Sequence, residues 1–109
     1  MTLRPSTGTL ITVAPTGAEH LKGDLPQLPT TTEELVETAV RCEAAGAALI
    51  HIHRRDVEHR PTLDLGLLRE AVAGVREATD LVVQLSTGGS VHDGYAARLA
   101  VLDAAPDSC

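Results

Sequence analysis

Residues 31–53 read TTEELVETAVRCEAAGAALIHIH and carry first the pattern of an amphipathic helix and then that of a buried strand. Thr31 and Glu34 have the spacing of a capping box, which starts a helix. Apolar side chains recur at helical spacing at Leu35, Ala39 and Cys42. Gly46 suits the helix end, and the short apolar run after it is typical of a strand. A helix that leads directly into a strand predicts an α/β protein.

The same alternation continues on both sides of this stretch. The sequence predicts a strand at 9–14, a helix at 64–78, a strand at 81–86 and a helix at 95–104. Strands that alternate with helices form parallel sheets through right-handed crossovers. In such folds ligands bind in the loops at the carboxyl ends of the strands.

The number of strands is too small for a complete fold of this kind. Three strands cannot close a barrel, and residues 106–109, PDSC, follow a helix just where a fourth strand would begin. We therefore expect residues 1–109 to be the amino-terminal portion of a single TIM (β/α)8 barrel domain, with its first three βα units present and the remainder absent.

Composition limits the classes of partner. The 109 residues carry a formal net charge of -6 and no basic cluster, which argues against nucleic acid and anionic membranes and favours a small molecule. Cys42 and Cys109 predict no disulfide framework. The apolar run near the amino terminus is short and interrupted, unlike a signal peptide, and nothing has the length of a membrane span. We expect a cytoplasmic protein.

His51 and His53 are the first candidate site residues. Side chains alternate along a strand, so both imidazoles share one face at its polar end. Two such rings can present nitrogens to one divalent ion at about 2.0–2.1 Å. The alternative is that one histidine is a hydrogen-bonded core group and the other is a solvated loop residue.

The segment QLSTGGS, residues 84–90, supplies a second candidate site. Ser86 shares a strand face with Gln84 and would point the same way as the histidines in a barrel. The backbone N–H groups of Gly88 and Gly89 can approach a carboxylate closely. The alternative is a simple glycine turn that joins a strand to a helix.

Other polar residues follow the first two strands. Glu19 is either a partner for a cationic substrate group, a general acid or base, or a solvated loop carboxylate. Arg54, Arg55 and Asp56 either clamp an anion or, as we expect, form ion pairs on the surface. The loop residues His59 and His92 are assigned no role.

Four stretches, taken together, resemble the β-keto acid cleavage enzymes of the 3-keto-5-aminohexanoate cleavage type. They are ITVAPTGAEH (11–20), LPQLPTTTEELVETAVRCEAAGAALIHIHRRD (25–56), RPTLD (60–64) and QLSTGGS (84–90). No single motif is decisive, but the order and spacing of the set are specific. The resemblance runs from about Ile11 to Pro106.

The resemblance implies a TIM barrel with zinc at its mouth. His51 and His53 would be zinc ligands, together with a late glutamate that has no counterpart in these residues. Ser86 matches the family's substrate-binding serine and is our catalytic candidate, with Gly88 and Gly89 on the substrate carboxylate. Glu19 matches the position that meets the amino group of an aminated substrate.

The implied reaction converts a β-keto acid and acetyl-CoA into acetoacetate and a new acyl-CoA. Because Glu19 is present, we expect an amino-substituted β-keto acid such as 3-keto-5-aminohexanoate. The full-length protein is expected to be a homo-oligomer, and the 109 residues alone to be inactive. Two alternatives are a zinc hydrolase on a barrel scaffold, which would release product without forming a CoA ester, and an inactive truncated fragment.

Overall fold

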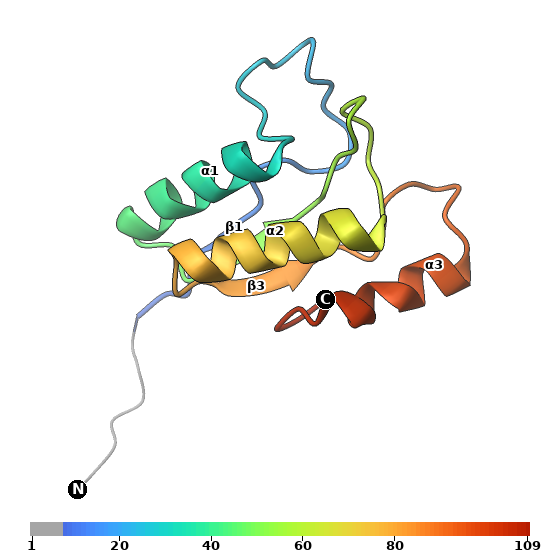
Figure 1. Cartoon of the computed structure of the whole chain (residues 1–109). Helices are drawn as coiled ribbons and strands as arrows, with labels where there is room; N and C mark the ends of the chain where they lie inside the picture. Colours follow the sequence, from blue (N-terminus) through green and yellow to red (C-terminus); the bar gives the residue numbers. More distant parts are fainter. Residues whose placement is uncertain (1–7) are drawn as a thin grey trace, which may run out of the picture.

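The computed structural model describes residues 8–109 (Figure 1). Residues 1–7, which include part of the stretch judged unlike a signal peptide, lie outside the described residues. The elements in chain order are β1 (Thr12–Val13), α1 (Thr32–Ala44), β2 (Leu49–Ile52), α2 (Leu65–Ala78), β3 (Val82–Leu85), α3 (Tyr95–Ala100) and the 3-10 helix η1 (Val101–Ala104). The predicted alternation of strands and helices is confirmed.

The three strands form one parallel sheet in the order β1-β2-β3. Ile50 is in register with Val83, and His51 with Gln84. β1 is shorter than the strand predicted at 9–14, because only Thr12 and Val13 pair with β2. The sheet therefore has the topology expected from consecutive right-handed βα units, with β2 in the centre.

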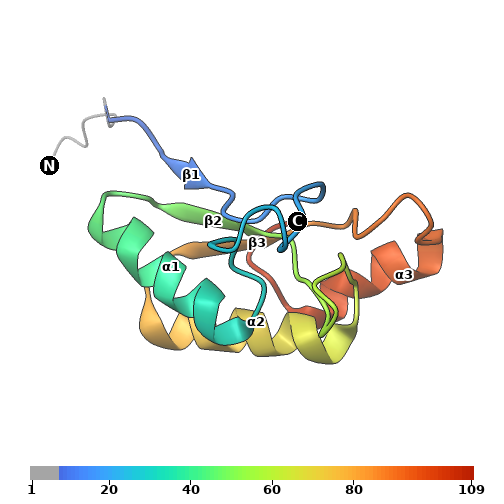
Figure 2. The ribbon, with the colours of Figure 1, turned by 90° about the horizontal axis from the view of Figure 1, so that it is seen from above.

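The helices cover one face of this sheet and leave the other face open (Figure 2). Successive strand residues point to opposite faces, and the buried ones face the helices. The core consists of Leu35, Ala39, Ile50, Ile52, Leu68, Ala71, Val72, Val75, Leu81, Val83, Leu85, Val101 and Ala104. On the open face Leu49, His51 and Gln84 are half-buried, and Val82 is 41% exposed. The open face of the sheet thus carries both polar and apolar side chains, and no helix of residues 8–109 covers it.

The start and stop of α1 follow the sequence signals. The Thr31 hydroxyl accepts a hydrogen bond from the Glu34 N–H, and the Glu34 carboxylate accepts one from the Thr31 N–H. Gly46 ends the helix with φ of +108°, a conformation that L side chains rarely adopt. The capping box and the glycine stop predicted from sequence are both confirmed.

The helix predicted at 95–104 is divided in two. After α3 the backbone tightens into η1, and Ala105, at φ of +53°, donates to the Leu102 carbonyl and turns the chain back toward the sheet. Ser108 then forms a parallel bridge with Gln84 on the free side of β3. This contact is an isolated bridge, so a fourth strand beside β3 stays a prediction.

Candidate functional site

The two candidate metal ligands lie at the carboxyl end of β2, on the open face of the sheet. His51 is inside the strand and His53 directly follows it. Their ring centroids are 5.3 Å apart, with the planes at 65°. The Nδ1 atom of His51 lies 2.7 Å from Oε1 of Gln84 on β3. The predicted convergence of the two imidazoles on one face is therefore present.

The chemistry of the two rings fits a metal ion. Burial, followed by the neighbouring His51 and Arg55, lowers the pKa of His53 and so favours the neutral ring that binds metals. Gln84 contacts Nδ1 of His51, so Nε2 of His51 is the ring nitrogen that remains for a metal ion. Within residues 8–109 no third His, Cys, Asp or Glu joins them. Zinc takes three or four protein ligands, so its binding by His51 and His53 stays a prediction.

Some polar groups of the predicted carboxylate-binding turn already form hydrogen bonds within the protein. Ser86 donates its N–H to the Ile52 carbonyl at 3.0 Å, and its hydroxyl accepts from the Gly88 N–H at 3.1 Å. Gly89 is buried, and a Cβ atom there would lie 2.4 Å from Oδ2 of Asp93. Close packing therefore explains the second glycine, while binding of a carboxylate by Ser86, Gly88 and Gly89 stays a prediction.

Glu19 and two of these glycines line one cavity of about 400 Å³, the size of a small-ligand pocket. Ala18, Glu19, Pro61, Gly88, Gly89, Ser90, Val91 and Arg98 line it. The structure thus brings Glu19 together with Gly88 and Gly89, whereas His51, His53 and Ser86 are not among the lining residues.

Arg98 also lines this cavity, and the sequence did not indicate it as a site residue. Its Nε atom donates to the Asp93 carbonyl at 3.1 Å and Nη2 to the Ser90 carbonyl at 3.2 Å. The signal was a single basic residue in the short helix after the glycine turn. The cavity therefore carries a carboxylate from the first loop and a guanidinium from α3.

The expectation that Arg54 and Arg55 form surface ion pairs is wrong. Arg54 is 6% exposed and Arg55 is 1% exposed. Arg54 donates to the carbonyl oxygens of Thr30 and Leu67, while Asp56 accepts from backbone N–H groups in its own turn. The acceptors come from distant segments, so they were not visible in the local sequence.

Arg55 joins two loops to the end of β2. Its Nη1 atom donates to the carbonyls of His20 and His59 at 2.9 and 3.0 Å, and Nη2 donates to the Gly17 carbonyl at 2.9 Å. Gly17 and His20 flank Glu19. Arg55 therefore fixes the backbone on both sides of this carboxylate relative to the histidine strand.

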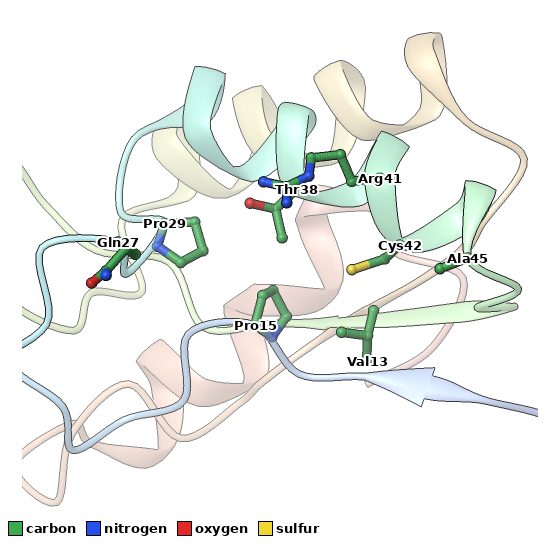
Figure 3. Close-up of a pocket in the computed structure, with 8 residues that line it drawn as sticks. All are labelled: Val13, Pro15, Gln27, Pro29, Thr38, Arg41, Cys42 and Ala45. Carbon is green, nitrogen blue, oxygen red and sulfur yellow. The ribbon is translucent and has the colours of Figure 1, made fainter.

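A separate hollow of about 500 Å³ lies between β1 and α1 (Figure 3). Its lining comprises Val13, Pro15, Gln27, Pro29, Thr38, Arg41, Cys42 and Ala45. Val13 is in register with Ile50, whose side chain faces the helices. This hollow is therefore on the opposite side of the sheet from the histidines.

The fold and the site together define an α/β protein whose polar residues gather at the carboxyl ends of parallel strands, as in α/β enzymes. Within residues 8–109 none of the helices has the length and apolar character needed to cross a membrane. Residues 9–109 match the beta-keto acid cleavage enzyme family, and the chain belongs to that family.

Curated relatives with similar sequences carry several related activities in their names. The chain is 40% identical over 91 residues to a 3,5-dioxohexanoate:acetyl-CoA acetone transferase of Paraburkholderia graminis, covering 83% of this chain and 29% of the relative. It is 40% identical over 83 residues to a 3-keto-5-aminohexanoate cleavage enzyme of Fusobacterium nucleatum, covering 75% and 30%. It is 36% identical over 81 residues to a 3-oxoadipate:acetyl-CoA acetyltransferase of Cupriavidus necator, covering 73% and 28%. The chain thus spans about 30% of the length of these relatives.

Proposed function

We propose that this chain forms the amino-terminal part of a zinc-dependent enzyme that cleaves β-keto acids by exchange with acetyl-CoA. The products would be acetoacetate and a new acyl-CoA. The observation that carries the proposal is the pair of imidazoles on the open face at the end of β2, with Nδ1 of His51 held by Gln84. Membership of the family supports the reaction type.

The complete fold that we propose is a TIM barrel. Ser108 already pairs with β3 on one side of the sheet. On the other side, a hollow of about 500 Å³ lies between β1 and α1 (Figure 3). Leu10 and Ile11, next to β1, are 66% and 50% exposed. Additional strands would cover these apolar groups and place the histidines inside the mouth of the barrel.

Each candidate residue then has a distinct task. Ser86 and the glycine amides would orient the substrate carboxylate, so that binding energy positions the keto group beside the histidines. Zinc held by His51 and His53 would supply Lewis-acid stabilisation of negative charge on the keto oxygen. Cleavage of the carbon–carbon bond needs such stabilisation, because the electron pair of the breaking bond leaves negative charge that must be stabilised.

Glu19 selects the substrate in this proposal. The exposed carboxylate of Glu19 favours a cationic substituent, such as the amino group of 3-keto-5-aminohexanoate. The guanidinium of Arg98 in the same cavity is engaged by the carbonyls of Asp93 and Ser90. The names of the relatives refer to a dioxo acid, an amino-substituted keto acid and a dicarboxylic keto acid. The named acids therefore differ in the substituents that they carry. A comparison of these three substrates is therefore the direct test of specificity.

The first experiment is the intact mass of the protein isolated from its source cells, with zinc determined on the same sample. A subunit mass well above 11.4 kDa with bound zinc supports the barrel and the metal site. A mass of 11.4 kDa without zinc would refute both and leave an inactive fragment. The native mass of the same sample tests the proposed homo-oligomer.

The second experiment uses the protein at this natural length and measures acyl-CoA formation from acetyl-CoA. The amino-substituted keto acid should be turned over faster than its neutral and dicarboxylic counterparts. Glu19→Gln should remove this preference, while turnover of the neutral acid is retained. Equal turnover of the neutral acid by the unaltered enzyme, unaffected by Glu19→Gln, would reject the role of Glu19. Loss of substrate without any CoA ester would instead identify a hydrolase.

A further inference from the structure

Gln84 connects His51 to the last segment of the chain. The two residues are opposite each other in the β2–β3 register. Oε1 of Gln84 lies 2.7 Å from Nδ1 of His51, and its Nε2 donates to the Ser108 hydroxyl at 3.0 Å. Ser108 is itself held beside β3, because its carbonyl accepts the Leu85 N–H at 3.0 Å. The carboxamide is therefore fixed at both ends.

The orientation of this carboxamide determines the proton position on His51. A side-chain amide has one end that only accepts and one end that only donates. Since the donor end of Gln84 is directed to Ser108, the acceptor end faces Nδ1 of His51. A short contact between this oxygen and Nδ1 requires that Nδ1 carry the hydrogen. The lone pair of the neutral ring is then on Nε2.

We propose that Gln84 is a positioning residue that holds His51 as its Nδ1–H tautomer, so that Nε2 is available as the metal-binding atom. The inference rests on the proposed function, because it gives the two-histidine pair a supporting group. Metal-ligating histidines are commonly oriented by an acceptor on their other nitrogen, and loss of that acceptor typically weakens metal binding about 10–100-fold. Ser108 acts one step further away, because its hydroxyl accepts the hydrogen bond from Nε2 of the amide.

Three substitutions separate positioning from general support of the sheet. Gln84→Met keeps a side chain of similar length but removes the acceptor. Gln84→Glu keeps an acceptor whichever way it rotates, and so no longer depends on Ser108. Ser108→Ala removes the acceptor of the Nε2 hydrogen bond and so loosens the amide. His53, which forms no hydrogen bond with Gln84 within residues 8–109, is the internal control.

The first readout is the tautomer of His51 in the metal-free protein at its natural length, from long-range ¹H–¹⁵N NMR correlations of the imidazole at pH 8. We expect Nδ1–H in the unaltered protein and in Gln84→Glu, and a shift toward Nε2–H in Gln84→Met. Ser108→Ala should give a mixture. His53 should keep the same pattern in all four proteins. An Nε2–H ring in the unaltered protein, or an unchanged tautomer in Gln84→Met, would overturn the proposal.

The second readout is zinc affinity, measured by competition with a chromophoric chelator. We expect Gln84→Met to lose about 10–100-fold and Gln84→Glu to stay within about threefold. A changed tautomer with unchanged zinc affinity would overturn the positioning role. The NMR result decides the tautomer without metal or turnover, so failure of the acyl-CoA assay would reject the proposed reaction and leave the tautomer assignment standing.

Discussion

Glu34 provides the most direct test of how the loop after β1 is attached to α1. Its carboxylate receives the Lys22 ammonium at 2.7 Å and the N–H groups of Thr30 and Thr31 at 3.3 and 3.1 Å. Mainly through Lys22, these contacts lower the pKa of Glu34 from 4.5 to about 2, although burial opposes the change. Lys22 belongs to the long loop that also carries Glu19. The perturbation we consider is Glu34→Gln.

The size of the effect follows from the pKa difference and the exposure. A difference of about 2.5 pH units corresponds to about 3.4 kcal/mol before screening. Since the Glu34 side chain is 38% exposed, solvent screening reduces this to about 1–2 kcal/mol. Glutamine retains an oxygen that can accept at the capping box, so the loss reports mainly the missing charge. We expect Glu34→Gln to lower the free energy of unfolding by about 1–2 kcal/mol at pH 7.

The pH dependence has a definite sign. The pKa in the folded state is below that in the unfolded state, so the unfolded chain takes up the proton first as the pH falls. The stabilisation is therefore complete above about pH 5 and is lost progressively as the pH falls from 4.5 toward 2. Half or more of the difference between the two proteins should be gone at about pH 3.

The assay is urea unfolding followed by circular dichroism at 222 nm, at several values of pH between 7 and 3. Glu37→Gln is the matched control, because Glu37 is an exposed residue of the same helix. Its effect should stay within about 0.5 kcal/mol at every pH. A Glu34→Gln effect that equals the control at pH 7, or that is the same at pH 7 and pH 3, would refute the reasoning.

Two further predictions concern residues around the cavity. Arg55→Lys cannot reproduce three hydrogen bonds to carbonyls and should cost about 2–4 kcal/mol of stability, with faster amide exchange in residues 17–20. Arg60→Lys, at an exposed position of the same turn, should leave both measurements unchanged. Gly89→Ala should destabilise the protein by about 1–3 kcal/mol, because its Cβ atom would lie 2.4 Å from Oδ2 of Asp93. At Gly88 the nearest contact of a Cβ atom would be 3.8 Å away, so Gly88→Ala should be nearly neutral in thermal unfolding, and equal effects of the two alanines would contradict the packing argument.

The sequence predicted those features that depend on neighbours along the chain. The capping box at Thr31 and the stop at Gly46 are local, and strand alternation correctly placed His51 and Gln84 on one face. Alternation could not show that Gln84 contacts His51, because that contact depends on the register between two strands. Gln84 was recognised only as a residue on the correct face.

Features that depend on distant backbone were not predicted. Two consecutive arginines in a polar loop resemble a solvated segment, yet Arg55 is buried because carbonyls up to 38 residues away surround it. Arg98 on α3 lines the same cavity as Glu19 in the first loop, although the two residues are far apart in the sequence. The division of the last helix at Val101 likewise follows from the return of the chain to β3.

The partners of Arg55 also have a consequence for the approach of ligands. Carbonyl oxygens accept from Nη1 and Nη2 of Arg55, while its buried Nε has no hydrogen-bond partner within residues 8–109. Unlike carboxylates, these carbonyls do not cancel the charge of the guanidinium. Although burial lowers the pKa of Arg55, an arginine remains protonated at neutral pH. A chain with a net charge of -6 thus keeps a fixed positive charge two residues beyond His53. Such a local field attracts anions against the overall repulsion, and its range shortens as ionic strength rises.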